Sequence, residues 1–254
     1  MIAIKECANK RYSFKGVFAM SYNQARRNDG GTRREYVYSY LYEKIIDFSL
    51  KPGSPISETE IGSQLSVSRT PIREALMQLA KEGLIEIKPQ IGTFVSLIDP
   101  KHIEESRFMR KAVELAVIRE ATEKLTPDSL YKLEKSLTMQ EIALREENER
   151  DFLAYDDEFH ELIYKGLGMD RIWKGIDQMN GQYKRVRMLR LITTKAAEWE
   201  TVLDEHRAIF NALKSKDIVT AEEVVNEHIT KGIIHLYEFK KEQPDYFKKD
   251  SILI

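Results

Sequence analysis

Apolar side chains recur every three or four residues along most of the chain, which is the spacing of one face of an amphipathic helix. In the N-terminal part such segments begin at Tyr36, at Glu58 and near Ser68–Thr70, and the third ends before Gly83. The stretch that follows, LIEIKPQIGTFVSL, alternates apolar and polar residues around a Pro-Gln-Ile-Gly turn. This period of two predicts a two-stranded hairpin. Three helices and a hairpin, with only the turn SVS before the third helix, are the order of a winged helix-turn-helix.

From about residue 101 to residue 241, long segments with helical spacing contain almost no Gly or Pro. The predicted helices are 101–124, 127–146, 148–166, 170–192, 196–215 and 217–240. Short links between them favour an all-α bundle. The expected fold is therefore mainly α, an N-terminal winged helix-turn-helix plus a C-terminal all-α six-helix bundle. The expected parts are a mobile N-terminal arm (1–30), the winged helix-turn-helix (31–98) and an all-helical domain (99–254).

The charge is divided unevenly between these parts, although the whole chain has a net charge of −1. Residues 1–98 hold 14 Lys and Arg against 10 Asp and Glu, a net +4, and the remaining residues hold 26 against 31, a net −5. A basic N-terminal part on an acidic remainder suits a nucleic-acid contact made by one end of the molecule.

Composition also indicates the compartment. The single cysteine, Cys7, cannot form an internal disulfide, which fits a reducing cytosol. The chain contains no run of about 18 apolar residues, and its first 20 residues lack the apolar run of a secretory signal. We therefore expect a cytoplasmic protein with no membrane partner.

The third predicted helix carries two arginines four residues apart. With the apolar stripe facing inward, Arg69 and Arg73 share the free face near the N-terminal end, which is the end that enters the major groove in helix-turn-helix docking. Guanidinium groups suit guanine edges or phosphates. The alternative is that both arginines are solvated, with Glu74 as a neighbour to pair with. Further expected DNA contacts are the hydroxyls beside the arginines and the wing of the hairpin: Ser68, Thr70, Lys88, Gln90, Gly92 and Thr93.

The helical domain contains a group of potential metal ligands. Asp156 and His160 are four residues apart, so a helix places them one turn apart on the same face. His206 and His228 lie on the last two predicted helices and can converge on that pair. Spacing alone leaves Asp157 and Glu158 as alternative carboxylates, and His235 faces the same way as His228 but about 10 Å further along the axis. One carboxylate with three imidazoles suits Zn²⁺, Ni²⁺ or Mn²⁺.

The segment ISETEIGSQLSVSRTPIREALMQLAKEGLIEIKPQIGTFV resembles the N-terminal domain of GntR-type bacterial transcription regulators, and the resemblance covers residues 36–97. It implies that Arg69, Arg73 and Gly92 contact operator DNA. Many relatives have a basic residue in the second half of the recognition helix, where this chain has Gln78. One phosphate contact is therefore expected to be absent or moved.

Residues 105–237 resemble the effector domain of the FadR-type subfamily, in its metal-containing branch, through the motifs MRKAVE, DDEFH, DEHRAIFNALKSKD and AEEVVNEHI. The resemblance implies that the all-helical domain binds an effector and forms the dimer. It implies a divalent metal ion, zinc in first place with nickel or manganese as alternatives, held by Asp156, His160, His206 and His228. His102 and His235 have no counterpart in the motifs, so we expect no metal contact from them.

In the motif MRKAVE, Arg110 matches an arginine that in relatives points into the cavity, where it can pair with a carboxylate of the effector. The alternative is an i,i+4 ion pair with Glu114. Arg185, Arg187 and Arg190 are expected to divide between the cavity and the surface, without an individual assignment.

These observations together predict a transcriptional regulator, a repressor, whose homodimer reads a pseudo-palindromic operator. A small carboxylate metabolite would bind beside the metal ion and change the affinity for DNA, with a spacing change near residues 96–101. One alternative is a regulator for which the metal ion itself is the signal. Another is a metal-dependent hydrolase, which is disfavoured because the chain has no H-E-x-x-H motif and a fused DNA-binding module would serve no purpose in it. We therefore expect no enzyme activity.

Overall fold

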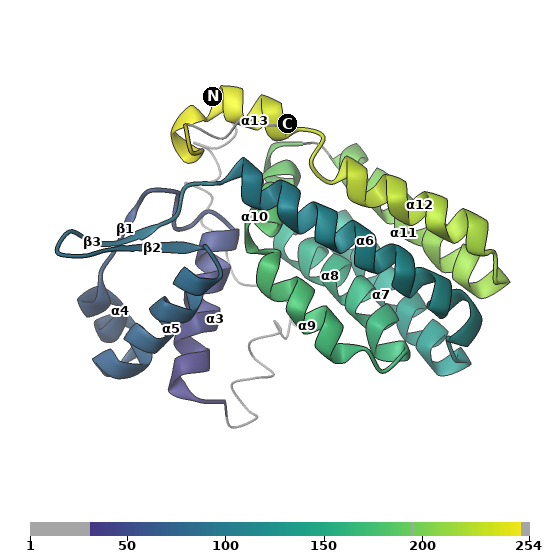
Figure 1. The fold of residues 1–254 in the computed structure, drawn as a ribbon, viewed down its shortest axis with the longest axis horizontal. Helices are drawn as coiled ribbons and strands as arrows, with labels where there is room; N and C mark the ends of the chain where they lie inside the picture. The colour runs from purple at the N-terminus through teal and green to yellow at the C-terminus, as the bar shows by residue number, and fades with distance from the viewer. Residues whose placement is uncertain (1–30, 195, 250–254) are drawn as a thin grey trace. The chain divides into compact units, whose positions relative to one another are not determined.

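The computed structural model describes residues 31–194 and 196–249 (Figure 1). The chain forms two compact units. Of the described residues, one unit contains 31–100 together with 238–249, and the other lies within Lys101–Tyr237. The arm predicted at the N-terminus lies outside the described residues.

The N-terminal unit contains the three predicted helices and the predicted hairpin. Its elements are α3 (Arg33–Ile46), β1 (Pro55–Ile56), α4 (Glu58–Leu65), α5 (Arg69–Lys81), β2 (Ile85–Lys88) and β3 (Gly92–Val95). The strands pair antiparallel in the order β1-β3-β2, so the hairpin is part of a three-stranded sheet. The additional strand forms because Val95 exchanges backbone hydrogen bonds with Gly53 and Ser54 just before β1.

The core of this unit follows the predicted apolar stripes. The buried residues of α5 are Ile72, Ala75, Leu76 and Leu79, as expected from the periodicity, and they face the buried Val37, Leu41 and Ile45 of α3. Gly83 follows the end of α5 with a φ of 70°, the left-handed conformation that glycine adopts without strain after a helix. The register of α5 is therefore fixed, and with it the side of the helix that stays exposed.

The second unit is all-helical, as predicted. Its helices are α6 (Pro100–Lys124), α7 (Pro127–Arg145), α8 (Glu149–Gly166), α9 (Asp170–Met179), α10 (Gly181–Thr193), α11 (Ala196–Ser215) and α12 (Ile218–Lys231). The helix predicted over 170–192 is two helices, because the Asn180-Gly181 pair favours a turn over a continuous helix. No helix among the described residues is long and apolar enough to cross a membrane.

The helix predicted over 217–240 ends at Lys231, and α13 (Leu236–Glu242) follows after a short turn. Gly232 lies at this end of α12, and a Cβ there would come 2.1 Å from the Tyr183 hydroxyl. The position therefore has no room for a side chain while the Tyr183 hydroxyl of α10 lies against this end of α12.

The C-terminal boundary of the helical domain differs from the expected range 99–254. Residues 238–249 belong to the N-terminal unit. After α13, the short 3₁₀ helix η1 (Pro244–Tyr246) leads to Phe247, which forms a parallel bridge with Ile98. The chain thus leaves the N-terminal unit after Pro100 and returns to it.

Candidate metal centre and nucleic-acid interface

The start of α5 presents the residues predicted to contact DNA. Ser66 is the C-cap of α4 and has a left-handed conformation, with a φ of 54°, and Ser68 is the N-cap of α5 in an extended conformation. Arg69 and Arg73 are both exposed, as are Ser68 and Thr70. Because the opposite face of α5 is buried in the core, these four side chains form one exposed polar end of the helix.

Arg73 pairs with the first turn of α4 and not with the neighbouring Glu74. Its Nε lies 3.0 Å from Glu58 Oε2, and the side chains are 64% and 30% exposed. A surface ion pair of this kind contributes little to stability, because water and salt screen it. The ion pair does restrict where the guanidinium points. A DNA base or phosphate can replace Glu58 as the partner of the guanidinium.

The wing lies between β2 and β3. Gln90 has a φ of 63° and Gly92 a φ of 146°, which produce the tight turn at its tip. Lys88 and Gln90 are exposed and Thr93 is half-buried. The ammonium of Lys88 lies 3.4 Å from Glu86 and 5.4 Å from the ring centre of Phe94. In α5, Gln78 donates to Glu82 at 3.1 Å, so its side chain is bound within its own helix.

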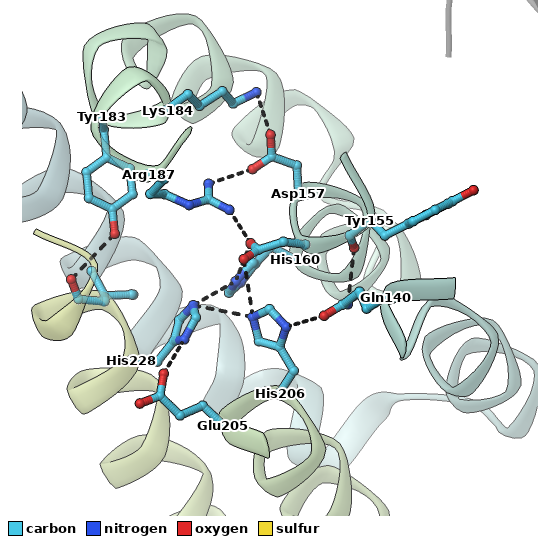
Figure 2. A network of polar contacts seen from close by, with 12 residues as sticks. Gln140, Tyr155, Asp157, His160, Tyr183, Lys184, Arg187, Glu205, His206 and His228 are labelled. Atoms are coloured by element: carbon cyan, nitrogen blue, oxygen red, sulfur yellow. Dashed lines mark hydrogen bonds and ion pairs between the residues drawn. The ribbon is translucent and has the colours of Figure 1, made fainter. Parts of the chain in front are cut away.

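The four predicted metal ligands come together inside the helical unit. Asp156 and His160 come from α8, His206 from α11 and His228 from α12, and all four are buried. One potential ligand atom from each lies within 4.8 Å of those of the others. Figure 2 shows the three imidazole rings pointing toward one another. The alternative carboxylates lie elsewhere, because Asp157 pairs with Lys184 at 2.9 Å and Glu158 is exposed.

Each imidazole is held at its Nδ1 atom by a hydrogen-bond acceptor. His160 Nδ1 lies 2.9 Å from Glu114 Oε2, and His228 Nδ1 lies 2.9 Å from Glu205 Oε2. Nδ1 of the third ring, His206, lies 2.7 Å from the side-chain oxygen of Gln140. The amide nitrogen of Gln140 donates to the Tyr155 carbonyl at 3.2 Å, which fixes the orientation of this amide.

These acceptors determine which nitrogen carries the proton. A carboxylate or amide oxygen can only accept, so each Nδ1 donates, and the Nε2 atom of each neutral ring is left with a lone pair. The Nε2 atoms of His160 and His228 are 3.2 Å apart, and those of His206 and His228 are 3.4 Å apart. Three lone pairs in this arrangement repel one another unless a cation lies between them.

The spacing fits such a cation. Nitrogen ligands lie about 2.0–2.1 Å from zinc, so two of them are about 2.9 Å apart at a right angle and about 3.3 Å apart at a tetrahedral angle. Asp156 adds a carboxylate, with Oδ1 3.7 Å from His160 Nε2 and Oδ2 3.9 Å from His206 Nε2. The hydrogen-bonded outer residues are those that orient imidazole ligands in metal sites. The residues present therefore fit a divalent metal ion.

Burial and the neighbouring charges keep Asp156, His160 and His206 in the ligand form. Burial alone would raise the pKa of Asp156, but the guanidinium of Arg187 and the nearby imidazoles hold that pKa well below its ordinary value. Burial lowers the pKa of His206 well below its ordinary value and also lowers that of His160. A charged carboxylate and neutral imidazoles are the forms that bind metals.

Arg187 contacts both the cluster and a neighbouring carboxylate. Its Nη1 donates to Asp157 Oδ1 at 2.7 Å (Figure 2). Its Nη2 donates to Asp156 Oδ1. Arg187 also lines a small cavity of about 30 Å³ beside the cluster, which is room for about two water molecules. The other polar residues that line the cavity are Asp156, Tyr183, Arg190, Glu205 and His228.

Arg110, the predicted effector contact, does not line this cavity. Its Nε lies 2.5 Å from Glu114 Oε1, and both side chains are almost fully buried. The ion pair with Glu114, which was the alternative for this residue, is the arrangement in the structure. Glu114 joins Arg110 to His160, so Arg110 reaches the cluster through Glu114.

Sequence reasoning missed the residues that hold the rings. Glu205 had a local signal, since it precedes His206, and Glu114 follows Arg110 by one helical turn. Gln140 had none, because a single glutamine on α7 does not reveal which helix packs beside it. Of the remaining histidines, His235 lies 3.7 Å from Glu198, away from the cluster, and His102 lies near the start of α6.

Comparisons with known proteins agree with both parts of the chain. The family model described as "Bacterial regulatory proteins, gntR family" matches residues 33–95, and that described as "FCD domain" matches residues 105–231. The chain is 32% identical over 216 residues to the HTH-type transcriptional repressor RspR of Escherichia coli, covering 85% of this chain and 94% of that one. It is 29% identical over 181 residues to the gluconate operon transcriptional repressor of Bacillus subtilis, covering 70% and 74%.

Solved structures share the fold. The structure described as E. coli McbR/YncC aligns with a TM-score of 0.73 at 23% identity, covering 82% of this chain and 98% of that one. A GntR regulator from Rhodococcus sp. RHA1, described as a putative one, aligns with a TM-score of 0.67 at 21% identity, covering 82% and 99%.

Proposed function

The chain belongs to the GntR family of bacterial regulatory proteins and is a transcriptional regulator with a helical FCD domain. From this premise, we propose that a small carboxylate bound beside a divalent metal ion controls its affinity for operator DNA. We further propose that it is a repressor of the metal-containing, FadR-type branch. The observation that carries the proposal is the convergence of Asp156 and three Nε2 lone pairs in one buried cluster.

The DNA contact is assigned to α5 and the wing. Arg69 and Arg73 are exposed on the face of α5 that the core leaves free, and they suit guanine edges and phosphates. The hydroxyls of Ser68 and Thr70 and the wing residues from Lys88 to Thr93 would hold the DNA backbone. Two copies of the chain would read the two halves of a pseudo-palindrome, since a two-fold dimer selects a two-fold site.

The metal ion is assigned to Asp156, His160, His206 and His228, with Glu114, Gln140 and Glu205 holding the rings in place. When bound there, a divalent ion supplies positive charge and open coordination positions for a carboxylate. The effector contact is assigned to Arg187 and Arg190, since both line the cavity beside the cluster. A guanidinium can bind a carboxylate through two parallel hydrogen bonds.

A second candidate is supported by the size of the cavity. About 30 Å³ holds about two water molecules, which is less than a carboxylate metabolite needs. The size of the cavity therefore favours an ion over a metabolite. In the second candidate the ion itself is the signal.

The test begins with an operator selected from random duplex DNA by the purified full-length protein. Its affinity is then measured by fluorescence anisotropy for protein treated with a chelator, for protein loaded with Zn²⁺, and for loaded protein with a panel of short hydroxy acids and sugar acids. Elemental analysis gives the metal content of each sample. His206→Ala serves as the variant with a damaged cluster.

The main proposal predicts that at least one carboxylate changes the operator affinity of the metal-loaded protein and leaves that of His206→Ala unchanged. A change on chelation, with no response to any carboxylate, would favour the ion as the signal. Full metal occupancy in His206→Ala would contradict the ligand assignment.

A further inference from the structure

The C-terminal end of the described chain is fastened to the segment that leads out of the N-terminal unit. Ile98 donates its N–H to the Tyr246 carbonyl at 2.8 Å, and Lys248 donates its N–H to the Ile98 carbonyl at 3.0 Å. The Lys248 ammonium lies 2.9 Å from Asp99 Oδ2. We call residues 244–249 the C-terminal strap. It contacts the two residues that come just before Pro100, where α6 begins.

The contact is packed as well as hydrogen-bonded. Phe247 is 1% exposed and Ile98 is fully buried, so the bridge between them lies in the core of the N-terminal unit. The ring of Tyr246 stacks on that of Phe48, with the ring centres 6.2 Å apart. Apolar burial, backbone pairing and an ion pair thus act on the same short segment, as in a built contact and unlike a frayed terminus.

The strap connects the two places where the chain passes between the units. The chain enters the helical unit at Lys101 and leaves it after Tyr237. The entering helix, α6, carries Glu114, which holds His160. The chain leaves within α13, which follows α12, the helix that carries His228, after a short turn. Each crossing is therefore linked along the chain to a residue of the metal cluster or to one that holds its rings, and the strap pairs the two segments within the DNA-binding unit.

We propose that the strap transmits the state of the metal cluster to the DNA-binding unit, so that operator affinity responds to the cluster only while residues 244–249 are docked on Ile98 and Asp99. The inference rests on the proposed function, since it names how that site is regulated. A unit joined by one flexible crossing can keep its preferred orientations whatever happens in its neighbour. When two crossings are fastened together, the DNA-binding unit has fewer orientations to choose from. A shift of α6 relative to α12 then changes which of these orientations it adopts.

The experiment compares the full chain with a chain shortened after Gln243, which lacks the strap. The probe is Zn²⁺ alone, and the measured quantity is the ratio of operator affinities between zinc-loaded and chelator-treated protein. Allosteric coupling of ordinary size gives a ratio of about 5 to 150. We expect such a ratio for the full chain and a ratio within about twofold of one for the shortened chain, with unchanged zinc content.

Point variants guard against misfolding of the shortened chain. Lys248→Ala removes the ion pair with Asp99 and should reduce the ratio at least about twofold, a fraction of an ordinary coupling. Lys249→Ala removes the same charge at the next, exposed position and should leave the ratio unchanged. The exchange of both partners, Asp99→Lys with Lys248→Asp, should restore the ratio lost in Lys248→Ala.

The outcomes separate the two proposals. If the shortened chain and Lys248→Ala bind zinc and keep the full ratio, the strap does not transmit and the inference is overturned, while the proposed control by the cluster stands. A full-chain ratio of one with zinc bound would overturn the inference too, because zinc then leaves operator affinity unchanged, whereas control of the metal-loaded protein by a carboxylate would stand. Loss of the ratio in Lys249→Ala as well would assign the effect to charge alone and would also overturn the inference.

Discussion

The sharpest test of the metal cluster concerns Gln140, which is not one of the proposed ligands. Its side-chain oxygen accepts from His206 Nδ1 at 2.7 Å, and its amide nitrogen donates to the Tyr155 carbonyl at 3.2 Å. Gln140→Leu keeps a similar volume and removes the acceptor. The ring of His206 then has a buried N–H with no acceptor, or it moves its proton to Nε2 and loses the lone pair that faces the cluster.

Either outcome for the His206 ring lowers the affinity for the metal ion. Removal of an outer residue that orients a histidine ligand costs about 10- to 100-fold in metal affinity. A factor of ten equals about 1.4 kcal/mol, so the binding free energy of zinc should weaken by about 1.4–2.8 kcal/mol. The metal-free protein should also lose about 1–3 kcal/mol of stability, because a buried donor is left unsatisfied.

Ser136 provides a matched control at the same carbonyl. Its hydroxyl donates to the Tyr155 carbonyl at 3.1 Å, in parallel with Gln140, whereas the hydrogen bond to His206 Nδ1 comes from Gln140. Ser136→Ala should cost about 1 kcal/mol of stability and leave zinc affinity unchanged. Zinc affinity is measured by competition with a chelator of known affinity, and stability by urea unfolding of metal-free protein. Equal zinc affinity in folded Gln140→Leu and wild type would refute the argument that Gln140 fixes the ring for metal binding.

Two further predictions concern the operator contact and the packing of the helical unit. Arg73→Ala should weaken binding to the selected operator by about 1–3 kcal/mol in anisotropy titrations. The control Glu58→Gln only frees the guanidinium and should not weaken binding. A loss of equal size in both variants would assign the effect to the ion pair. Gly232→Ala should lower the unfolding free energy by about 1–3 kcal/mol, because the new Cβ would meet the Tyr183 hydroxyl, and a thermal scan should show it. The matched change Gly175→Ala, in a helix with open space around it, should instead stabilise by about 0.4–1 kcal/mol, and destabilisation there would contradict the steric argument.

The sequence predicted features that depend on local periodicity. The buried face of α5 follows from the spacing of Ile72, Leu76 and Leu79, and this spacing alone leaves Arg69 and Arg73 outside. The bundle and most of its helix ends follow from the same rule together with the few Gly and Pro residues. The break at Asn180 was missed, although the pair Asn-Gly is a turn signal, because apolar spacing continues across it.

Features that depend on contacts between distant segments were not predictable in the same way. Helical spacing placed Asp156 and His160 together, but the choice of Asp156 over Asp157 depended on the family resemblance. Whether Arg110 faces a cavity or Glu114 depends on how α6 packs on α8, and no local pattern reveals that. The pairing of Ile98 with Phe247 joins two segments far apart in the chain, and neither segment carries a periodic signal.

The distribution of the cluster over the helices indicates what a metal ion can change. Its four donors come from α8, α11 and α12, and the three residues that hold the rings come from α6, α7 and α11. An ion that draws the donors together therefore acts on five helices at once. The lone pairs of the metal-free cluster repel one another, so the same helices should relax outward when the ion leaves. Because α6 begins at one chain crossing and α12 precedes α13, in which the other crossing lies, a small change in packing at the cluster has a covalent route to the DNA-binding unit from both sides.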